Sequence, residues 1–431
     1  MTRALATSIE HGVAELVGWL SAADGSALVV IDEGIVGTQV DHEVQQAVRR
    51  SGVVAERRVI THHSRLPAVL DLASRMGKCN SIVAVGGGGV VDQVKLATIL
   101  AGDGGLERVL RHPHRCGLVA LPLGARRRHR FATVLTTVGT GSHVSPNACL
   151  EVDGRKRLYS SPALRPDVSV IDPVATASLP GWLLIEGVLE NVARLAGVYV
   201  GSADDVNYSS DADVESLAQS LVAIGYEARA ALVQGAKPGA GLRAELAGLS
   251  GRTHRPDLAA GREHYVDKSW PMAHELSAGL GLRKVQAMSS ILVPLWRRIE
   301  DGQAGFGSER RLARFWSRSA FVARPALGSR PSRGLERLLA DWDIDAGAAR
   351  RALDLTGDAA PEEARLLADR TWQSWGLRLP MLRGLCVDDV RALYADLLTP
   401  GHGQGGLAPA RVLVPGPHLP AADRLSVTTS Q

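Results

Sequence analysis

Four consecutive glycines follow an apolar, β-branched run in the stretch VAVGGGGVVDQVK (residues 83–95). The run predicts a buried strand, and the Asp-x-x-Lys segment after the glycines has helical character. A strand that ends in glycines and enters a helix leaves backbone N–H groups and the positive end of the helix free to bind an anion. The stretch therefore indicates a diphosphate site, although a tight strand-to-helix turn without a ligand explains the same glycines.

A second glycine-containing stretch, TTVGTGSHVSPNACL (residues 136–150), offers small hydroxyl groups beside a flexible backbone. Taken alone, it fits a polar loop as well as a ligand-binding loop. The segment GRKRLYSSPALRPDVSVIDP (residues 154–173) follows it closely. Two such loops in one part of the chain favour ligand binding over a purely structural purpose.

The segments around these loops predict alternating strands and helices. Strands are expected at residues 27–32, 57–62, 81–87, 117–122, 131–136 and 167–172. The segment LPAVLDLASRMGKCN, between the second and third strands, has apolar residues at spacings of three and four, as in an amphipathic helix. Alternation of this kind predicts a parallel sheet with helical crossovers.

The character of the sequence changes near residue 180. From about residue 181 to 398 nearly every segment has helical spacing. The tail from Thr399 is rich in Gly and Pro without sustained periodicity, which is typical of a flexible extension. We therefore expect an α/β domain (1–180), an all-helical domain (181–398) and a flexible tail (399–431).

The composition is typical of a globular, cytoplasmic protein, with 45% hydrophobic and 22% charged residues. No apolar run is long enough to span a membrane, and the acidic residues near the N-terminus are unlike a signal peptide. The four cysteines include no CxxC pair, which argues against a zinc cluster and a disulfide framework. The net charge is only +4, so the basic character does not indicate a nucleic-acid partner.

Three motifs together resemble the superfamily of iron-containing alcohol dehydrogenases and dehydroquinate-synthase-like enzymes. The family patterns are GGGSxxDxxK, TTxGTGSE and SPxLxPDxxxxDPxxxxxLP. This sequence has GGGGVVDQVK, TTVGTGSH and SPALRPDVSVIDPVATASLP in the same order. The resemblance covers roughly residues 25 to 300. It implies a dehydroquinate synthase-like fold, with a Rossmann-like parallel-sheet α/β domain, an all-α C-terminal domain and NAD(P) in the cleft between them.

The resemblance also implies which residues bind the cofactor. The diphosphate would lie against Gly86, Gly87, Gly88 and Gly89, and the nicotinamide ribose near Asp92 and Lys95. Thr136, Thr137 and Thr140 would line the cofactor, and Lys156 would lie close to its nicotinamide end. Asp32, at the end of the first strand, matches the acidic residue that pairs with the adenosine ribose. A carboxylate there repels a 2′-phosphate and favours NAD over NADP, and the alternative for Asp32 is a turn or helix cap.

The metal site of the iron-dependent relatives is only partly present in this sequence. Those relatives hold a divalent ion with an Asp, a His four residues later and two more His from a later helix pair. Here the Asp position is Glu190, the first His position is Arg194, and one later His remains as His274. A further family histidine becomes Ala278, and the last metal His falls near Val285. A permanent cation at Arg194 would repel the ion, so no metal is expected.

Two interpretations of these three residues stay open. In the first, Arg194 replaces the charge of the metal and binds a substrate carboxylate or an alkoxide, Glu190 orients it, and His274 is the general base. In the second, Glu190 and Arg194 form only an i,i+4 helix salt bridge, and His274 is an inert remnant.

A basic insertion, GARRRHR (residues 124–130), precedes the strand that leads into the stretch at residues 136–150, which we call the threonine loop. Its default interpretation is a solvated loop. The alternative is an anchor for an acidic partner or an acidic substrate tail.

The leading functional hypothesis is an NAD-dependent oxidoreductase that oxidises a secondary alcohol, or reduces the ketone, without a metal. Composition and metal-site drift suggest bacterial specialised metabolism. Some members of this superfamily that serve daptide-type ribosomal-peptide pathways are thought to oxidise a C-terminal threonine to a β-keto acid that loses carbon dioxide. The substrate would then be a small alcohol or a peptide C-terminus.

Two other hypotheses remain. A sugar-phosphate cyclase of the dehydroquinate synthase type would use NAD transiently and eliminate phosphate, and Glu190 resembles the metal glutamate of that branch. A non-catalytic NAD-binding scaffold is the third. The resemblance is compatible with a homodimer in each case.

Overall fold

The computed structural model describes residues 7–22, 25–61, 64–263 and 265–398. Contacts group these described residues into one compact unit. The tail expected from Thr399 onward lies outside the described residues. None of the described helices is both long and apolar enough to cross a lipid bilayer.

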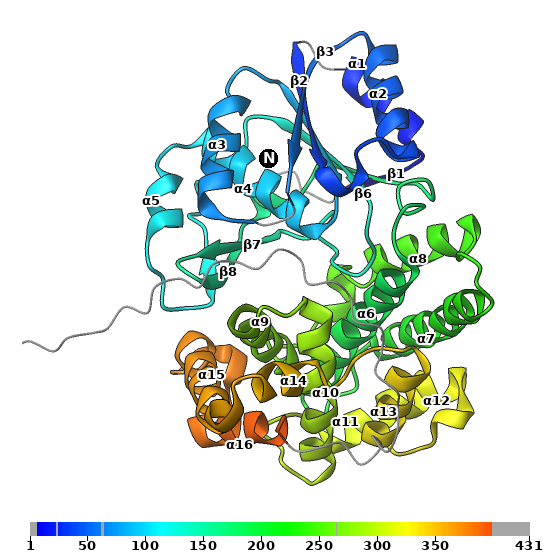
Figure 1. The fold of residues 1–431 in the computed structure, drawn as a ribbon, viewed down its shortest axis with the longest axis vertical. Coiled ribbons are helices and arrows are strands. Elements are labelled where there is room, and N and C mark those ends of the chain that lie inside the picture. The colour runs from blue at the N-terminus through cyan, green and yellow to red at the C-terminus, as the bar shows by residue number, and fades with distance from the viewer. Residues whose placement is uncertain (1–6, 23–24, 62–63, 264, 399–431) are drawn as a thin grey trace, which may run out of the picture. The chain divides into compact units, whose positions relative to one another are not determined.

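A parallel sheet of six strands forms the first part of the chain (Figure 1), in the order β1-β9-β6-β4-β2-β3. Its strands are β1 (Ser8–His11), β2 (Ser26–Asp32), β3 (Val54–Ile60), β4 (Ser81–Gly86), β6 (Arg130–Leu135) and β9 (Val168–Ile171). The helices of this part are α1 (Leu16–Ser21), α2 (Gln39–Ser51), α3 (Leu66–Met76), α4 (Gly88–Gly102) and α5 (Leu106–Arg111). The expected parallel α/β architecture is confirmed.

Alternating side chains of the central strands fill two separate cores. On β2, Leu28 and Val30 pack with α3 and α4, whereas Val29 and Ile31 pack with α1 and α2 on the other face. Successive residues of a strand point to opposite faces, so a strand covered on both faces becomes a continuous apolar run. Figure 1 shows the two helix layers on either side of the sheet.

A second sheet was not anticipated from the sequence. It contains β5 (Leu118–Ala120), β8 (Arg155–Ser160) and β7 (Asn147–Val152), in the order β5-β8-β7. The strand expected at 117–122 therefore belongs to this sheet and not to the main one. Strands β7 and β8 form an antiparallel hairpin whose turn, Asp153 and Gly154, has φ angles of 49° and 67°.

After β9, the described part of the chain contains helices and no strand. The α-helices are α6 (Gly181–Gly201), α7 (Asp211–Val233), α8 (Ala240–Arg252), α9 (Ser269–Leu280), α10 (Lys284–Glu300), α11 (Glu309–Arg318), α12 (Ala320–Ala323), α13 (Pro331–Asp341), α14 (Ala348–Asp354), α15 (Ala360–Trp375) and α16 (Val387–Asp396). The change from strands to helices falls between Ile171 and Gly181, close to the expected position. A domain boundary at 180/181 stays a prediction.

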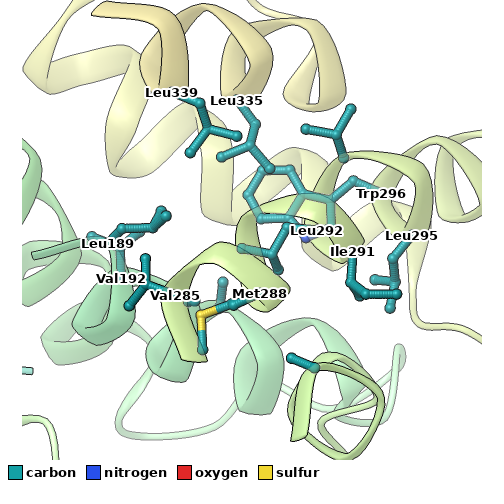
Figure 2. Close-up of a cluster of buried hydrophobic side chains, with 14 of the residues drawn as sticks. Leu189, Val192, Val285, Met288, Ile291, Leu292, Leu295, Trp296, Leu335 and Leu339 are labelled. Carbon is teal, nitrogen blue, oxygen red and sulfur yellow. The ribbon is translucent and has the colours of Figure 1, made fainter. Parts of the chain in front are cut away.

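One hydrophobic cluster holds α6 against α10. Figure 2 shows Leu189 and Val192 of α6 with Val285 and Met288 of α10, all buried members of this cluster. Val285 stands near the position of the last metal histidine of the relatives, and its side chain belongs to the apolar core. This packing fixes the first turn of α10 beside the middle of α6, where Glu190 lies.

Candidate active site

The glycine turn lies at the carboxyl edge of the parallel sheet. Gly86 ends β4, Gly87 precedes α4 and Gly88 begins it. A Cβ added to Gly87 would lie 2.9 Å from Cγ2 of Thr137, and one added to Gly88 would lie 2.9 Å from Cγ2 of Thr140. The glycines therefore allow the threonine loop to approach the start of α4. This close approach is a structural reason for Gly87 and Gly88. Their contact with a diphosphate stays a prediction.

The same turn has features that fit an anionic cofactor. No side chain caps α4, and its first turn contains no acidic residue. Within the described residues, the buried hydroxyl of Thr137 has no hydrogen-bond partner. The N–H of Thr136 donates to the carbonyl of Gly86 at 3.2 Å, which joins the two loops at the edge where α/β proteins bind ligands. These residues fit NAD(P) diphosphate.

Asp32 ends β2 at the same edge. One of its carboxylate oxygens, Oδ1, accepts a hydrogen bond from the N–H of Gly34 at 3.0 Å and caps a 3₁₀ helix, Glu33–Ile35. The helix-cap role is therefore present. Pairing of Asp32 with a ribose stays a prediction.

Asp92 and Lys95 tie α4 to the segment before and at the start of β7. The carboxylate of Asp92 accepts from the hydroxyl of Ser142 at 2.5 Å and from the N–H of Cys149 at 2.9 Å. Lys95 is fully buried, and its Nζ donates to the carbonyls of Ser145 and Asn147 at 2.9 and 2.8 Å. Burial raises the pKa of Asp92 and lowers the pKa of Lys95 to about 8. Both side chains therefore hold α4 against this segment, and their contact with the nicotinamide ribose stays a prediction.

Lys156 connects the small sheet to α9. Its Nζ, on β8, donates to the hydroxyl of Ser277 at 2.9 Å. Burial lowers the pKa of Lys156. The amine is therefore positioned beside α9, which also carries His274.

Glu190, in the middle of α6, is the acidic centre of the site. Its Oε1 accepts from Nζ of Lys284 at 2.5 Å and from the guanidinium of Arg194 at 3.3 Å. Burial alone would raise the pKa of Glu190, but the charges of Lys284 and Arg194 bring it below its ordinary value. The carboxylate is thus ionised and paired with two cations.

Arg194 holds the threonine loop against the helices. Besides Glu190, its guanidinium donates to the carbonyl of Gly139 at 2.5 Å and to the side-chain oxygens of Asn191 and Thr253 at 2.8 and 3.0 Å. A guanidinium has five N–H groups. These contacts leave little capacity for a substrate, so they favour the interpretation in which Arg194 is structural.

His274 is enclosed by aromatic rings. Its ring centroid lies 5.1 Å from that of Trp270 and 5.7 Å from that of Trp375. Burial, helped by the charges of Lys156 and Lys284, lowers its pKa to about 3. Within the described residues, its Nε2 has no hydrogen-bond partner. His274 is therefore neutral with a free ring nitrogen.

Two more histidines, His143 and His254, were missed in the sequence. Burial lowers the pKa of His143 to about 3, and burial with the charge of Arg194 lowers that of His254 well below its ordinary value. Nε2 of both rings, and Nδ1 of His143, lack partners among the described residues. His254 occupies the space of the absent Cβ of Gly141, whose φ is +61°. His143 stands where the family motif has Glu, which was a visible signal; His254 had none.

Lys284 is the third residue that sequence analysis missed. It directly precedes Val285, the position matched to the last metal histidine, so a shift of one residue would have found it.

The residues present do not fit a divalent metal ion. Glu190, the only acidic residue matched to the family's ligands, already has Lys284 and Arg194 as partners. Among the residues that the structure describes, no group of three or more His, Cys, Asp or Glu side chains is arranged to hold a metal.

The basic insertion 124–130 is mostly occupied with internal contacts. Arg127 pairs with Asp167, His129 hydrogen-bonds the Cys79 carbonyl at 2.7 Å, and the Arg130 guanidinium lies 4.4 Å from the Trp19 ring centroid. These contacts favour a structural loop over an anchor for an acidic partner.

Comparison with known proteins finds similarity to one protein family. Residues 7–173 match the family model described as iron-containing alcohol dehydrogenase. This part of the chain is therefore similar to the iron-containing alcohol dehydrogenases. The matched residues include the glycine and threonine motifs, so the match supports the resemblance that these motifs indicated.

Three curated relatives illustrate the range of the superfamily. Long-chain-alcohol dehydrogenase 1 of Geobacillus thermodenitrificans is 25% identical over 74% of this chain and 75% of its own length. The NADPH-dependent aldehyde reductase YqhD of Escherichia coli is 26% identical over 53% of this chain and 56% of its own length. The probable alcohol dehydrogenase EutG of Salmonella typhimurium is 30% identical over 31% of each chain. This chain thus matches less than two thirds of the length of two of them.

Solved structures confirm the fold class. The crystal structure of YqhD from Escherichia coli K-12 has a TM-score of 0.72 at 20% identity, covering 91% of this chain and 97% of that one. NADH-dependent butanol dehydrogenase A of Thermotoga maritima has a TM-score of 0.70 at 18% identity, covering 93% and 98%. The α/β sheet followed by helices is therefore the dehydroquinate synthase-like fold.

Proposed function

We propose that this protein is an NAD-dependent oxidoreductase that oxidises a secondary alcohol, or reduces the corresponding ketone, without a bound metal ion. The observation that carries the proposal is the environment of Glu190. Its carboxylate already has two cationic partners, Lys284 and Arg194. A divalent ion bound to the same carboxylate would lie against both positive charges, and such repulsion is costly at a buried position.

The loops that would bind the cofactor support an enzyme that still uses NAD. When bound, NAD would accept the carbinol hydrogen together with its electron pair. The free N–H groups at the start of α4 would hold the diphosphate, with the Thr137 hydroxyl available as a further partner. The carboxylate of Asp32 favours a ribose with free hydroxyls over a 2′-phosphate.

The charges around Glu190 favour an anionic substrate. The charges of Lys156 and Lys284 both act on the ring of His274, and electrostatic attraction draws anions toward such cations. An alcohol that carries a carboxylate fits this chemistry. We therefore propose a hydroxy acid or a peptide C-terminus as substrate, and among peptides a ribosomal precursor that ends in threonine, made for bacterial specialised metabolism. Oxidation of that threonine gives a β-keto acid, which loses carbon dioxide.

Paired substrates test this proposal. Purified protein is incubated with NAD and either 3-hydroxybutyrate or butan-2-ol, and with either an acetylated tripeptide ending in threonine or its C-terminal amide. NADH absorbance, carbon dioxide and phosphate release are followed. We expect NADH with the carboxylate-bearing member of each pair, and carbon dioxide in addition, because oxidation of either carboxylate-bearing substrate gives a β-keto acid.

The alternative functions predict different results. A sugar-phosphate cyclase would release phosphate from a sugar phosphate without net NADH, and a scaffold would bind NAD and form neither product. NADH formation that is equal for both members of each pair would contradict the anionic substrate but leave a dehydrogenase. The curated relatives named above, which are dehydrogenases and a reductase, favour the dehydrogenase.

A further inference from the structure

Two neighbouring ion pairs join α6 to the start of α10, and they differ in what surrounds them. Lys284 pairs with Glu190 at 2.5 Å, and Arg283 pairs with Glu186 at 2.6 Å. The guanidinium of Arg283 also lies 4.5 Å from the ring centroid of Trp182, an exposed residue. Arg283 therefore contributes to a surface contact, whereas Lys284 extends toward the candidate active site.

The charge of Lys284 affects a group of buried residues from several elements. It acts on the pKa values of Asp92, Cys149, Glu190, His254 and His274. These residues belong to α4, β7, α6, α9 and the segment after α8. The lysine is thus central to the site, although no motif of the sequence identified it.

Lys284 also has hydrogen-bonding capacity that Arg194 lacks. An ammonium has three N–H groups, and the described contacts of Lys284 are with Glu190 alone. Its side chain is 37% exposed, against 20% for Arg194. Arg194 donates to four acceptors of the protein. Of the two cations on Glu190, Lys284 is therefore the one that can contact a substrate.

We propose that Lys284 is a catalytic residue whose ammonium donates a hydrogen bond to the reacting oxygen of the substrate, the position at which relatives use a metal ion. Arg194 is a positioning residue that holds Glu190 and the Gly139 carbonyl. The inference rests on the proposed oxidoreductase function. Lys284 stabilises the negative charge that develops on the oxygen, as any fixed, preorganised donor does.

The step balances without any change in Lys284. The alcohol loses its carbinol hydrogen, with the bonding electron pair, to the bound cofactor. The hydroxyl proton passes to water, and the oxygen forms the second bond of the carbonyl group. The products are the ketone, reduced cofactor and one proton, and Lys284 keeps all of its hydrogens.

Lys284→Ala and Arg283→Ala form a matched pair for the test, because each removes one ion pair between the same two helices. With 3-hydroxybutyrate or the threonine tripeptide, we expect Lys284→Ala to lower kcat/KM about 100-fold and Arg283→Ala to leave it nearly unchanged. NADH binding, followed by fluorescence, should be the same in both variants. Ethylammonium chloride should restore part of the lost rate in Lys284→Ala, and sodium chloride at equal ionic strength should not.

Each outcome decides between the claims. Equal kcat/KM in both variants, or a loss that ethylammonium does not restore, would overturn the role of Lys284 and leave the oxidoreductase function intact. Absence of NADH formation by the wild-type protein would instead overturn the proposed function, and this inference with it. If Lys284→Ala does not fold, Lys284→Arg serves in its place: it keeps the charge but moves the donors, and full activity would contradict the proposal.

Discussion

The glycine turn and the cluster around Glu190 have diverged to different extents from the family pattern. The turn keeps three glycines, Gly86 to Gly88, and the absent side chains of Gly87 and Gly88 let the threonine loop approach α4. At Glu190 the acidic character is kept, but its partners are Lys284 and Arg194. Where two backbone segments must lie this close together, a residue with a side chain cannot easily replace glycine. A buried carboxylate needs compensating positive charge, and protein side chains can supply it in place of a metal ion.

The largest effect is expected from removing the charge of Glu190. Glu190→Gln leaves Lys284 and Arg194 without their common partner, and we expect unfolding to become easier by about 3–5 kcal/mol. Urea denaturation measures this loss. Glu186→Gln removes the neighbouring ion pair and should cost only about 1 kcal/mol. Similar decreases in the free energy of unfolding in the two variants would contradict the view that Glu190 stabilises both Lys284 and Arg194.

A dependence of stability on pH should come from the histidines of the same region. The pKa values of His143 and His274 are lowered to about 3, so between pH 6.5 and 3 only the unfolded state binds their protons. The full contribution to the free energy of unfolding is therefore present above the unfolded pKa. It decreases as the pH is lowered through this window, by up to about 1.4 kcal/mol per pH unit for each histidine.

Replacing one of these histidines should reduce that slope. The free energy of unfolding is measured at several pH values by urea titration, and its slope against pH gives the number of protons taken up on unfolding. In His143→Gln we expect this number to be smaller by about one. An unchanged slope in His143→Gln would show that His143 is already protonated in the folded protein.

The glycine turn should respond through cofactor binding. In Gly88→Ala the new Cβ would lie 2.9 Å from Thr140, and the resulting overpacking costs about 1–3 kcal/mol. We expect NADH to bind about tenfold more weakly, as measured by fluorescence titration. Gly104, where an added Cβ meets nothing within 4 Å, provides the control variant Gly104→Ala. Equal NADH affinities would argue against a cofactor at this turn.

The smallest effect is expected at Asp32. Asp32→Ser keeps an oxygen that can cap the 3₁₀ helix but removes the charge. Relative affinity for NADPH over NADH should rise by about tenfold, with unchanged thermal stability. If the preference between the two cofactors is unchanged, Asp32 caps the 3₁₀ helix but does not select the cofactor.

The fold could be predicted from the sequence because its signals are local. Apolar strands such as residues 81–87 and the amphipathic segment after residue 65 are visible in short windows, and the structure confirms them. The hairpin of β7 and β8 was missed because charged residues such as Lys156 and Arg157 interrupt its alternation. The strand at 117–122 was found, but its pairing with β8 depends on a contact distant in sequence.

The candidate site was less predictable for the same reason. Glu190 and Arg194 are four residues apart on one helix, so their contact could be expected from spacing. The contacts of Arg194 with Gly139 and Thr253 depend on tertiary packing, and they change its expected role. Lys284 approaches Glu190 only because Val285 and Met288 pack against α6. A single sequence does not reveal such an arrangement.

The most direct test of the account is NADH formation by protein that has been dialysed against a chelator and analysed for metal. Protein with far less than one equivalent of iron and zinc should oxidise 3-hydroxybutyrate or the threonine tripeptide at a rate that neither ion increases. Turnover that appears only after one equivalent of iron or zinc is added would contradict the central claim, because a metal ion and not Lys284 would then stabilise the substrate oxygen.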